Sequence, residues 1–308
     1  MYKEAGAKVA ERFKEASLLV GIKEPLKKSL YRDAVYMVFS HTSKGQKYNM
    51  PLLKKMIERK ITLIDYEKIA DIHGRRLVYF GRFAGICGLF DTLHYFGKKI
   101  EYRGIRNIFC DIMPAYRYNS LHDMRTALIK LRDKIFKKGL DERLCPFIFG
   151  ITGHGNVSSG IQEMLDLLKP IEIHPADMLE FVGHKKHVCN KVYKIVLGRS
   201  DRLRSKYGGR FNSEEYLQHP DRYESNMEIY LPHLNILLNA SYWDSRFPRL
   251  ITKEMLRHIY SKDFRLEFIA DISCDINGAI ELTHKLTTPD KPVFTYNIKT
   301  DRFKDGFR

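Results

Sequence analysis

Short apolar runs alternate with longer segments of helical periodicity along most of this chain. The runs 17–23 and 35–40 have the pattern of buried strands, and each ends at a polar residue, Lys23 or His41. Further strands are predicted at 62–65, 147–150, 171–173, 192–197, 236–238 and 268–272. Because strands alternate with helical segments, we expect parallel sheets with crossover helices. The predicted fold class is therefore α/β.

The helical segments differ in the residues that line them. A helix follows Asn49, a predicted N-cap, and includes Pro51 in its first turn. Small and large apolar residues alternate from Phe83 to Phe96, which suits a helix packed between layers. Longer apolar faces predict a helix over 120–138 and another that opens at Ile161. The tyrosine-rich segment 199–230 is polar, and we expect an irregular excursion there.

The length of 308 residues suggests two domains. We predict two Rossmann-like domains around a cleft. The first covers residues 1–140 and holds the substrate, and the second, at 141–275, binds a dinucleotide. The tail at 276–308 is expected to pack back on the first domain.

Charge and cysteine content narrow the class of protein. The chain has 53 Lys and Arg against 37 Asp and Glu, a net charge of +16, which attracts anions of several kinds. Its basic residues are dispersed, which favours small anions over nucleic acid. The sequence has no apolar run of membrane-spanning length and no signal-peptide core, and its five cysteines are scattered. We expect a soluble protein with reduced thiols, in the cytoplasm or mitochondrial matrix. The oligomeric state stays open.

A glycine-rich loop joins a predicted strand to a predicted helix at 150–160. Gly153 and Gly155 allow a tight turn and a close approach of the backbone to a pyrophosphate at the helix N-terminus. Dinucleotide binding is favoured over a purely structural turn, although the spacing departs from G-x-G-x-x-G. The next predicted strand ends near His174 without a carboxylate, although Asp177 is close, and Lys185-Lys186 could reach a 2′-phosphate. We therefore favour NADP over NAD.

Lys23 and His41 follow strands that are neighbours along the chain. Ligands of open α/β sheets bind at the carboxyl edge, where these two side chains can divide acid and base roles. Spacing alone leaves the ordinary alternatives open, namely a solvated lysine and a hydrogen-bonded structural histidine.

Several short sequence motifs, which follow one another in a particular order, carry a more specific signal. They are Gly21-Ile-Lys-Glu-Pro25, Phe39-Ser-His-Thr-Ser-Lys44 with Gln46, Gly74-Arg-Arg76, Phe80, Gly153-x-Gly-Asn-Val-Ser-x-Gly160, Tyr242-Trp243 and Asp271-Ile-Ser273. In this order they resemble the lysine-forming saccharopine dehydrogenases, above all the lysine–ketoglutarate reductase half of the aminoadipic semialdehyde synthases. The resemblance extends over nearly the whole chain.

The resemblance implies an alanine dehydrogenase-like oxidoreductase of lysine degradation that condenses L-lysine with 2-oxoglutarate and reduces the imine with NADPH to saccharopine. By this resemblance, Lys23 matches a residue that accepts a proton and His41 matches a residue that donates one. The positions that match substrate contacts are Lys44, Gln46, Arg76 and Phe80. The positions that match cofactor contacts are Arg75, Gly153, Gly155, Asn156, Val157, Asp271, Ile272 and Ser273.

The chain also departs from the family pattern. Family members begin with a further strand–helix–strand portion, and this chain starts after it, so the first domain is expected to be incomplete. The alternative function is therefore a non-catalytic nucleotide-binding relative of the same fold. The tyrosines and arginines of 199–230 also suggest RNA stacking, which we disfavour. His184, His187 and Cys189 lack the spacing of a metal site, and we expect none.

Overall fold

The computed structural model describes residues 2–11, 16–43, 45, 47–184 and 187–307. The chain divides into two compact units, Met1–Phe80 and Gly81–Arg308. This division lies earlier than the domain boundary predicted near residue 140, because the two helices before that point share their apolar core with the sheet of the second unit. The assignment of functional domains stays a prediction.

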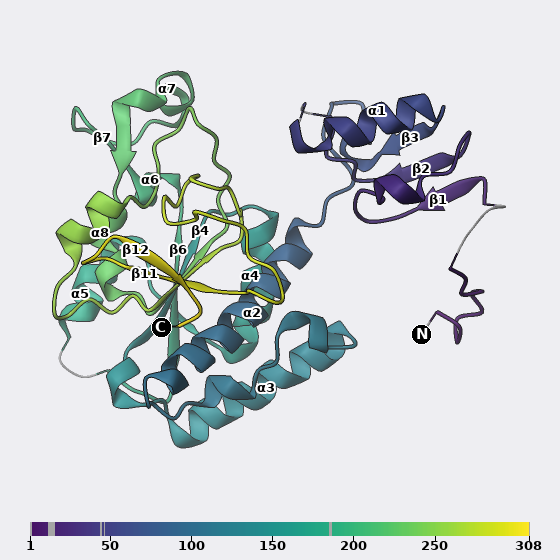
Figure 1. The fold of residues 1–308 in the computed structure, drawn as a ribbon. Helices are drawn as coiled ribbons and strands as arrows, with labels where there is room; N and C mark the ends of the chain where they lie inside the picture. Colours follow the sequence, from purple (N-terminus) through teal and green to yellow (C-terminus); the bar gives the residue numbers. More distant parts are fainter. Residues whose placement is uncertain (1, 12–15, 44, 46, 185–186, 308) are drawn as a thin grey trace. The chain divides into compact units, whose positions relative to one another are not determined.

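Unit 1, residues 1–80, contains a three-stranded parallel sheet in the order β1-β2-β3 (Figure 1). Its elements are β1 (Leu18–Val20), β2 (Val35–Val38), α1 (Met50–Glu58) and β3 (Thr62–Asp65). The buried core of this sheet and helix consists of Leu30, Ala34, Tyr36, Leu52 and Met56. Because β2 is parallel to both neighbours, all three strands end at the same edge of the sheet.

The start of α1 differs from the prediction. Asn49 stands at the N-cap, but its side chain makes no capping hydrogen bond. Its Nδ2 instead donates to the carbonyl oxygen of Ser40 at 3.0 Å. Asn49 therefore fastens the helix to the segment that follows β2.

Unit 2, residues 81–308, contains a five-stranded parallel sheet in the order β10-β9-β4-β6-β5. These strands are β4 (Phe147–Thr152), β5 (Ile171–Glu172), β6 (Val192–Leu197), β9 (Ile236–Asn239) and β10 (Phe268–Asp271). The α/β class is confirmed by the parallel pairing in both units. The central strands β4, β6 and β9 are buried along their whole length, as a sheet covered on both faces requires.

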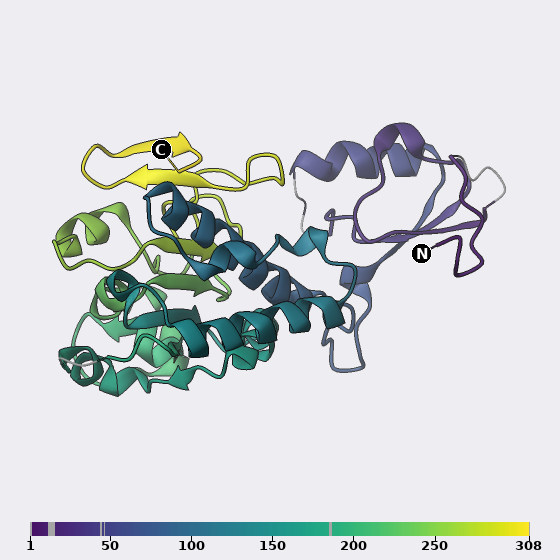
Figure 2. The same cartoon turned by 90° about the horizontal axis from the view of Figure 1, so that it is seen from below.

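Two apolar clusters cover the faces of this sheet. One cluster includes α2 (Gly81–Tyr102), α3 (Leu121–Lys138) and α4 (Asn156–Leu165). The other includes α5 (Met178–Gly183), α8 (Lys253–Ile259) and the C-terminal hairpin of β11 (Phe294–Asn297) and β12 (Arg302–Asp305), shown in Figure 2. The tail predicted to pack on residues 1–140 thus contributes Tyr296, Ile298 and Phe303 to the core of unit 2.

Glycines allow α2 and α4 to pack closely. A Cβ on Gly85 would overlap the carbonyl oxygen of Val157, and a Cβ on Gly160 would overlap that of Arg82. These close approaches explain the small residues in the predicted helix 83–96. Cys87 lies on the exposed side of α2.

The segment 199–230 is more ordered than its polar composition suggested. It contains α6 (Arg199–Arg202), β7 (Leu203–Ser205), α7 (Ser213–Gln218) and β8 (Tyr223–Ser225). Tyr216, Tyr223 and Tyr230 are buried in the second cluster. The hydroxyl of Tyr223 donates to Glu215 at 2.7 Å, so the polar group of this buried side chain has a hydrogen-bond partner within the same segment. A composition-based prediction misses such a core because tyrosine counts as both polar and apolar.

Two cysteines also differ from expectation. Cys145 and Cys189 form a disulfide with a Cα–Cα distance of 5.6 Å, whereas all five thiols were predicted to be reduced. Cys145 precedes β4 and Cys189 precedes β6, and these strands pair in parallel, so their starts lie side by side. Their sequence separation of 44 leaves no local sequence signal for the pair.

Candidate functional site

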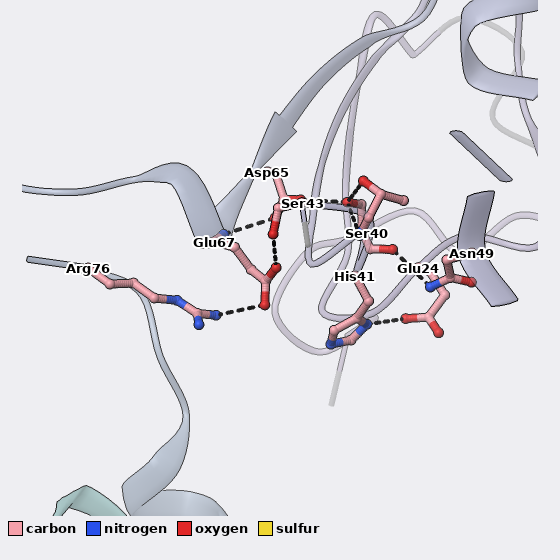
Figure 3. A network of polar contacts seen from close by, with 9 residues as sticks. Glu24, Ser40, His41, Ser43, Asn49, Asp65, Glu67 and Arg76 are labelled. Atoms are coloured by element: carbon pink, nitrogen blue, oxygen red, sulfur yellow. Dashed lines mark hydrogen bonds and ion pairs between the residues drawn. The ribbon is translucent and has the colours of Figure 1, made fainter. Parts of the chain in front are cut away.

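His41 lies just after β2, and its Nδ1 is 2.8 Å from Oε2 of Glu24 (Figure 3). Its backbone is in the left-handed region, with φ of 49°, which is uncommon outside turns and functional positions for a residue other than glycine. Burial of Glu24 opposes its ionisation, but hydrogen bonds from its own backbone, His41 and Asn49, with the charge of His41, lower its pKa overall. An ionised Glu24 accepts from Nδ1 and leaves Nε2 of His41 as the nitrogen that exchanges a proton.

Lys23 follows β1 at the same edge of the sheet. Strand β1 pairs with β2 in parallel, with Val20 opposite Met37, and the backbone amide of Phe39 donates to the carbonyl oxygen of Ile22 at 3.3 Å. Lys23 and His41 are therefore carried by the ends of adjacent strands, as the sequence predicts. The Lys23 residue is exposed, and its catalytic role stays a prediction.

A hydrogen-bond network ties the end of β2 to the end of β3. The hydroxyl of Ser40 donates to Oδ2 of Asp65 at 2.5 Å, and Oδ1 of Asp65 accepts from the backbone amide of Glu67 at 2.9 Å. Ser43 donates to the Glu67 carboxylate, whose other oxygen lies 3.6 Å from Nη2 of Arg76 (Figure 3). This network fixes the loop that carries His41 through the buried Ser40 beside it.

Arg76 and Phe80, two predicted substrate contacts, meet at the ring of Phe39. The Arg76 guanidinium lies 5.1 Å from the Phe39 ring centroid, and the Phe80 ring meets Phe39 edge-on at 5.5 Å. The Arg76 side chain is 40% exposed, so one edge of its guanidinium remains accessible to a carboxylate. The other two predicted substrate contacts, Lys44 and Gln46, lie outside the described residues.

Arg75, a predicted cofactor contact, stands in a turn at 71–75 of unit 1. Its Nε donates to Asp71 at 3.0 Å, and its side chain is largely exposed. Binding of a phosphate by Arg75 requires it to exchange or share this partner, and the role stays a prediction.

The glycine loop connects β4 to α4 in unit 2. Gly153 has φ of +81°, which other residues rarely adopt, while a Cβ on Gly155 would meet no atom within 4 Å. Gly155 is the N-cap of α4, and no side chain of the described residues caps this helix. The amides of Asn156 and Val157 in its first turn are therefore available to an anion. This arrangement suits the pyrophosphate of a dinucleotide, and cofactor binding by these residues stays a prediction.

The last three predicted cofactor contacts lie at the end of β10, which pairs with β9 on the side opposite β4. Asp271 is held by several donors: Asn239 Nδ2 at 2.8 Å, Ser273 Oγ at 2.7 Å and Thr283 Oγ1 at 2.6 Å. Thr152 at the end of β4 joins them by donating to Asn239 at 2.7 Å. Ile272 contributes to the apolar cluster beneath α2. The carboxyl ends of three neighbouring strands are thereby fixed relative to one another.

The sheet order corrects one step of the cofactor argument. The end of the next strand along the chain, near His174 and Asp177, was considered as the place that contacts the adenosine ribose. That strand is β5, at the edge of the sheet, and β6 lies between it and β4. The residues beside the glycine loop are those after β6, from Gly198 onward. Lys185 and Lys186 lie outside the described residues.

Sequence reasoning missed the acids of unit 1. No role is predicted from the sequence for Glu24, Asp65 or Glu67. Their positions at or just after the ends of β1 and β3 are a usable signal, because polar residues at strand ends collect at the edge that binds ligands.

No group of three or more His, Cys, Asp or Glu side chains in the part of the chain that the structure describes is arranged to hold a metal ion. Within the same residues, every helix is too short or too polar to cross a membrane.

Comparison with known proteins gives several relatives. Residues 1–87 match the family model "Alanine dehydrogenase/PNT, N-terminal domain". The α-aminoadipic semialdehyde synthase of Arabidopsis thaliana is 34% identical over 99% of this chain and 30% of its own length, and the mitochondrial one of Mus musculus is 32% identical over 99% and 34%. The NAD(+), L-lysine-forming saccharopine dehydrogenase of Neurospora crassa is 23% identical over 92% of this chain and 60% of its own.

A solved structure of L-alanine dehydrogenase aligns with 96% of this chain and 67% of its own, at 15% identity and a TM-score of 0.49. The chain spans about a third of the length of the two synthases. Over nearly its whole length, the chain is homologous to one segment of the α-aminoadipic semialdehyde synthases.

Proposed function

We propose that this chain is an oxidoreductase that condenses L-lysine with 2-oxoglutarate and reduces the product to saccharopine with NADPH. The observation that carries the proposal is the His41–Glu24 pair, which presents one ring nitrogen for proton transfer at the sheet edge where Lys23 also lies. Homology to the synthases and the name of the Neurospora crassa relative support this substrate class. The mitochondrial relatives support the mitochondrial matrix as one of two candidate compartments, beside the cytoplasm.

Each proposed step has a residue suited to it. Lys23 accepts a proton from the ε-ammonium of the substrate lysine, so that the amine attacks the ketone carbon of 2-oxoglutarate. His41, held by Glu24, donates a proton to the carbinolamine oxygen, which leaves as water and yields a protonated imine that needs only a hydride to become the secondary amine. Arg76 pairs with a substrate carboxylate. NADPH, when bound, supplies the hydride that reduces the imine carbon.

The direct test is NADPH oxidation by the purified full chain. We expect a decrease in absorbance at the NADPH band that requires both lysine and 2-oxoglutarate, with saccharopine identified by mass spectrometry. NADH in place of NADPH tests the cofactor, and we expect a slower reaction. Binding of NADPH without turnover would instead favour the non-catalytic alternative. A folded chain that binds no dinucleotide contradicts both functions.

Replacement of Glu24 by glutamine should lower kcat by about tenfold or more, because a charge-assisted hydrogen bond that orients His41 is lost. The lowered pKa of Glu24 means that the pair stabilises the fold above the unfolded-state pKa of this carboxyl group. That stabilisation is lost as the pH falls through the lower folded-state pKa. The variant should therefore lose this acid-side dependence of stability, as measured by thermal melting across acidic pH.

The kinetic readout separates positioning from substrate binding. With Glu24→Gln we expect KM for lysine and 2-oxoglutarate to change little and the pH profile of kcat to shift. The matched control is Glu58→Gln on the exposed end of α1. Equal kcat values and pH profiles in wild type and Glu24→Gln would exclude the positioning role.

A further inference from the structure

The strand beside the glycine-loop strand ends in a basic segment. Strands β4 and β6 pair in parallel up to Thr152 opposite Leu197, so the turns that follow them leave the sheet side by side. The amide of Gly153 donates to the carbonyl oxygen of Leu197 at 2.8 Å. Cε1 of His154 lies 3.3 Å from the position of a Cβ on Gly198. The segment that begins at Gly198 is thus the direct neighbour of the glycine loop.

The residue type after β6 differs from that of an NAD site. An NAD-binding domain places a carboxylate after the neighbouring strand, where it accepts hydrogen bonds from the ribose hydroxyls. Here Gly198 is followed by Arg199. The nearest acid in this turn, Asp201, uses Oδ2 to accept from the backbone amide of Gly198 at 2.7 Å. A ribose at this position meets a guanidinium in place of a ribose-binding carboxylate.

A pocket of about 200 Å³ opens at this segment. It is lined by three arginines and three large aromatic residues, among others: Arg199, Arg202, Arg246, Tyr216, Tyr242 and Trp243. The guanidinium group of arginine can donate two parallel hydrogen bonds to phosphate oxygens, and an aromatic ring can pack against a nucleobase or a sugar. The lining therefore has the chemistry of a phosphorylated nucleoside site.

Two of the three guanidinium groups are not neutralised by an acid. Arg246 is paired with Asp244 at 2.7 Å, whereas no carboxylate of the described residues forms an ion pair with Arg199 or Arg202. Arg202 is only 7% exposed, and its Nε donates to the Gly198 carbonyl at 3.0 Å. Burial lowers the pKa of Arg202 to about 10, so it stays charged at neutral pH. A buried cation without an anion is costly, and a bound phosphate would offset that cost.

We propose that Arg199 and Arg202 bind a phosphate on the 2′ position of the cofactor's adenosine ribose and make the chain selective for a 2′-phosphorylated dinucleotide. This inference rests on the proposed dinucleotide binding. It moves the cofactor-selecting residues from the region of His174–Lys186 to the turn after β6.

The test compares the binding of 2′,5′-ADP and 5′-AMP, which differ only in the 2′-phosphate, by isothermal titration calorimetry with the full chain. We expect wild type to prefer 2′,5′-ADP by about tenfold or more, since charge-assisted hydrogen bonds to the phosphate are lost in 5′-AMP. Arg199→Gln should remove most of this preference, Arg199→Lys should retain part of it, and neither should change binding of 5′-AMP. Arg210→Gln, at an exposed arginine of the same excursion, is the matched control.

Each outcome decides between the two proposals. Equal affinity of wild type for both ligands, or an unchanged preference in Arg199→Gln, overturns the selectivity inference. If 5′-AMP binds in these cases, the proposed dinucleotide binding still stands. Failure of wild type to bind 2′,5′-ADP, 5′-AMP and NADPH overturns the nucleotide site itself. Thermal melting of each variant shows whether it is folded; Arg199 is exposed, and its guanidinium lies 6.0 Å from the ring centroid of the buried Tyr216, a contact whose loss the melting temperature would report.

Discussion

Replacement of His41 by glutamine is expected to lower kcat/KM for saccharopine formation by about 10²- to 10⁴-fold, the range that general acid–base catalysis contributes. Glutamine can still hydrogen-bond to Glu24, but it cannot donate a proton to the departing hydroxide. Lys23→Met should have a comparable effect, because methionine keeps a long unbranched side chain at this position but removes the basic nitrogen. The measurement is the steady-state rate of NADPH oxidation with lysine and 2-oxoglutarate.

Matched controls separate chemistry from folding. His122→Gln and Lys130→Met repeat both substitutions at exposed positions of α3 in unit 2, and we expect wild-type rates from them. NADPH affinity should be unchanged in the His41 and Lys23 variants, since the proposed phosphate-binding amides belong to α4. A His41→Gln protein with wild-type kcat/KM would show that the proton donor is another group.

Replacement of Gly155 by aspartate should weaken NADPH binding by about 100-fold. The new carboxylate would occupy the amides at the start of α4 and repel the pyrophosphate, and loss of charge-assisted hydrogen bonds worth about 1.5–3 kcal/mol each is enough for that factor. A Cβ at this position meets no atom within 4 Å. Aspartate is also a favoured N-cap, so the variant should melt no lower than wild type.

The readout for Gly155→Asp is a fluorescence titration with NADPH. Gly155→Ala is the control for loss of glycine, and it should bind almost as wild type does because the space is open. Gly183→Asp adds the same charge at the end of α5, where a Cβ also meets no atom within 4 Å. Wild-type affinity in Gly155→Asp would show that the phosphates bind elsewhere.

The local elements of the fold were largely predictable from the sequence. The strands at 62–65 and 192–197 coincide with β3 and β6. The fully buried β6 requires a near-continuous apolar run, whereas β3 is only partly buried. The predicted helix 120–138 corresponds to α3, whose N-cap Ser120 accepts from the amide of Asp123 at 3.1 Å. The helix after the glycine loop begins at Asn156, earlier than predicted, because glycine and serine in its first turn weaken the periodic signal.

Candidate site residues were predictable where residues close together in the sequence form a recognisable pattern. The glycine loop and the polar ends of β1 and β2 carry such local signals, and the structure places them at carboxyl ends of parallel strands. The pairing of His41 with Glu24 carries none, since it joins residues from different strand ends. The network from Ser40 to Asp65 was missed for the same reason.

The sequence by itself determined the α/β class, the order of the main strands and helices outside segment 199–230 and the tail, and the glycine loop, because each depends on periodicity or on neighbouring residues. Only the tertiary structure decided the order of strands within the sheet. The insertion of β6 between β4 and β5 places Arg199 beside the glycine loop, and it brings Cys145 to Cys189. Strand order depends on packing between residues far apart in the chain, to which no local pattern is sensitive.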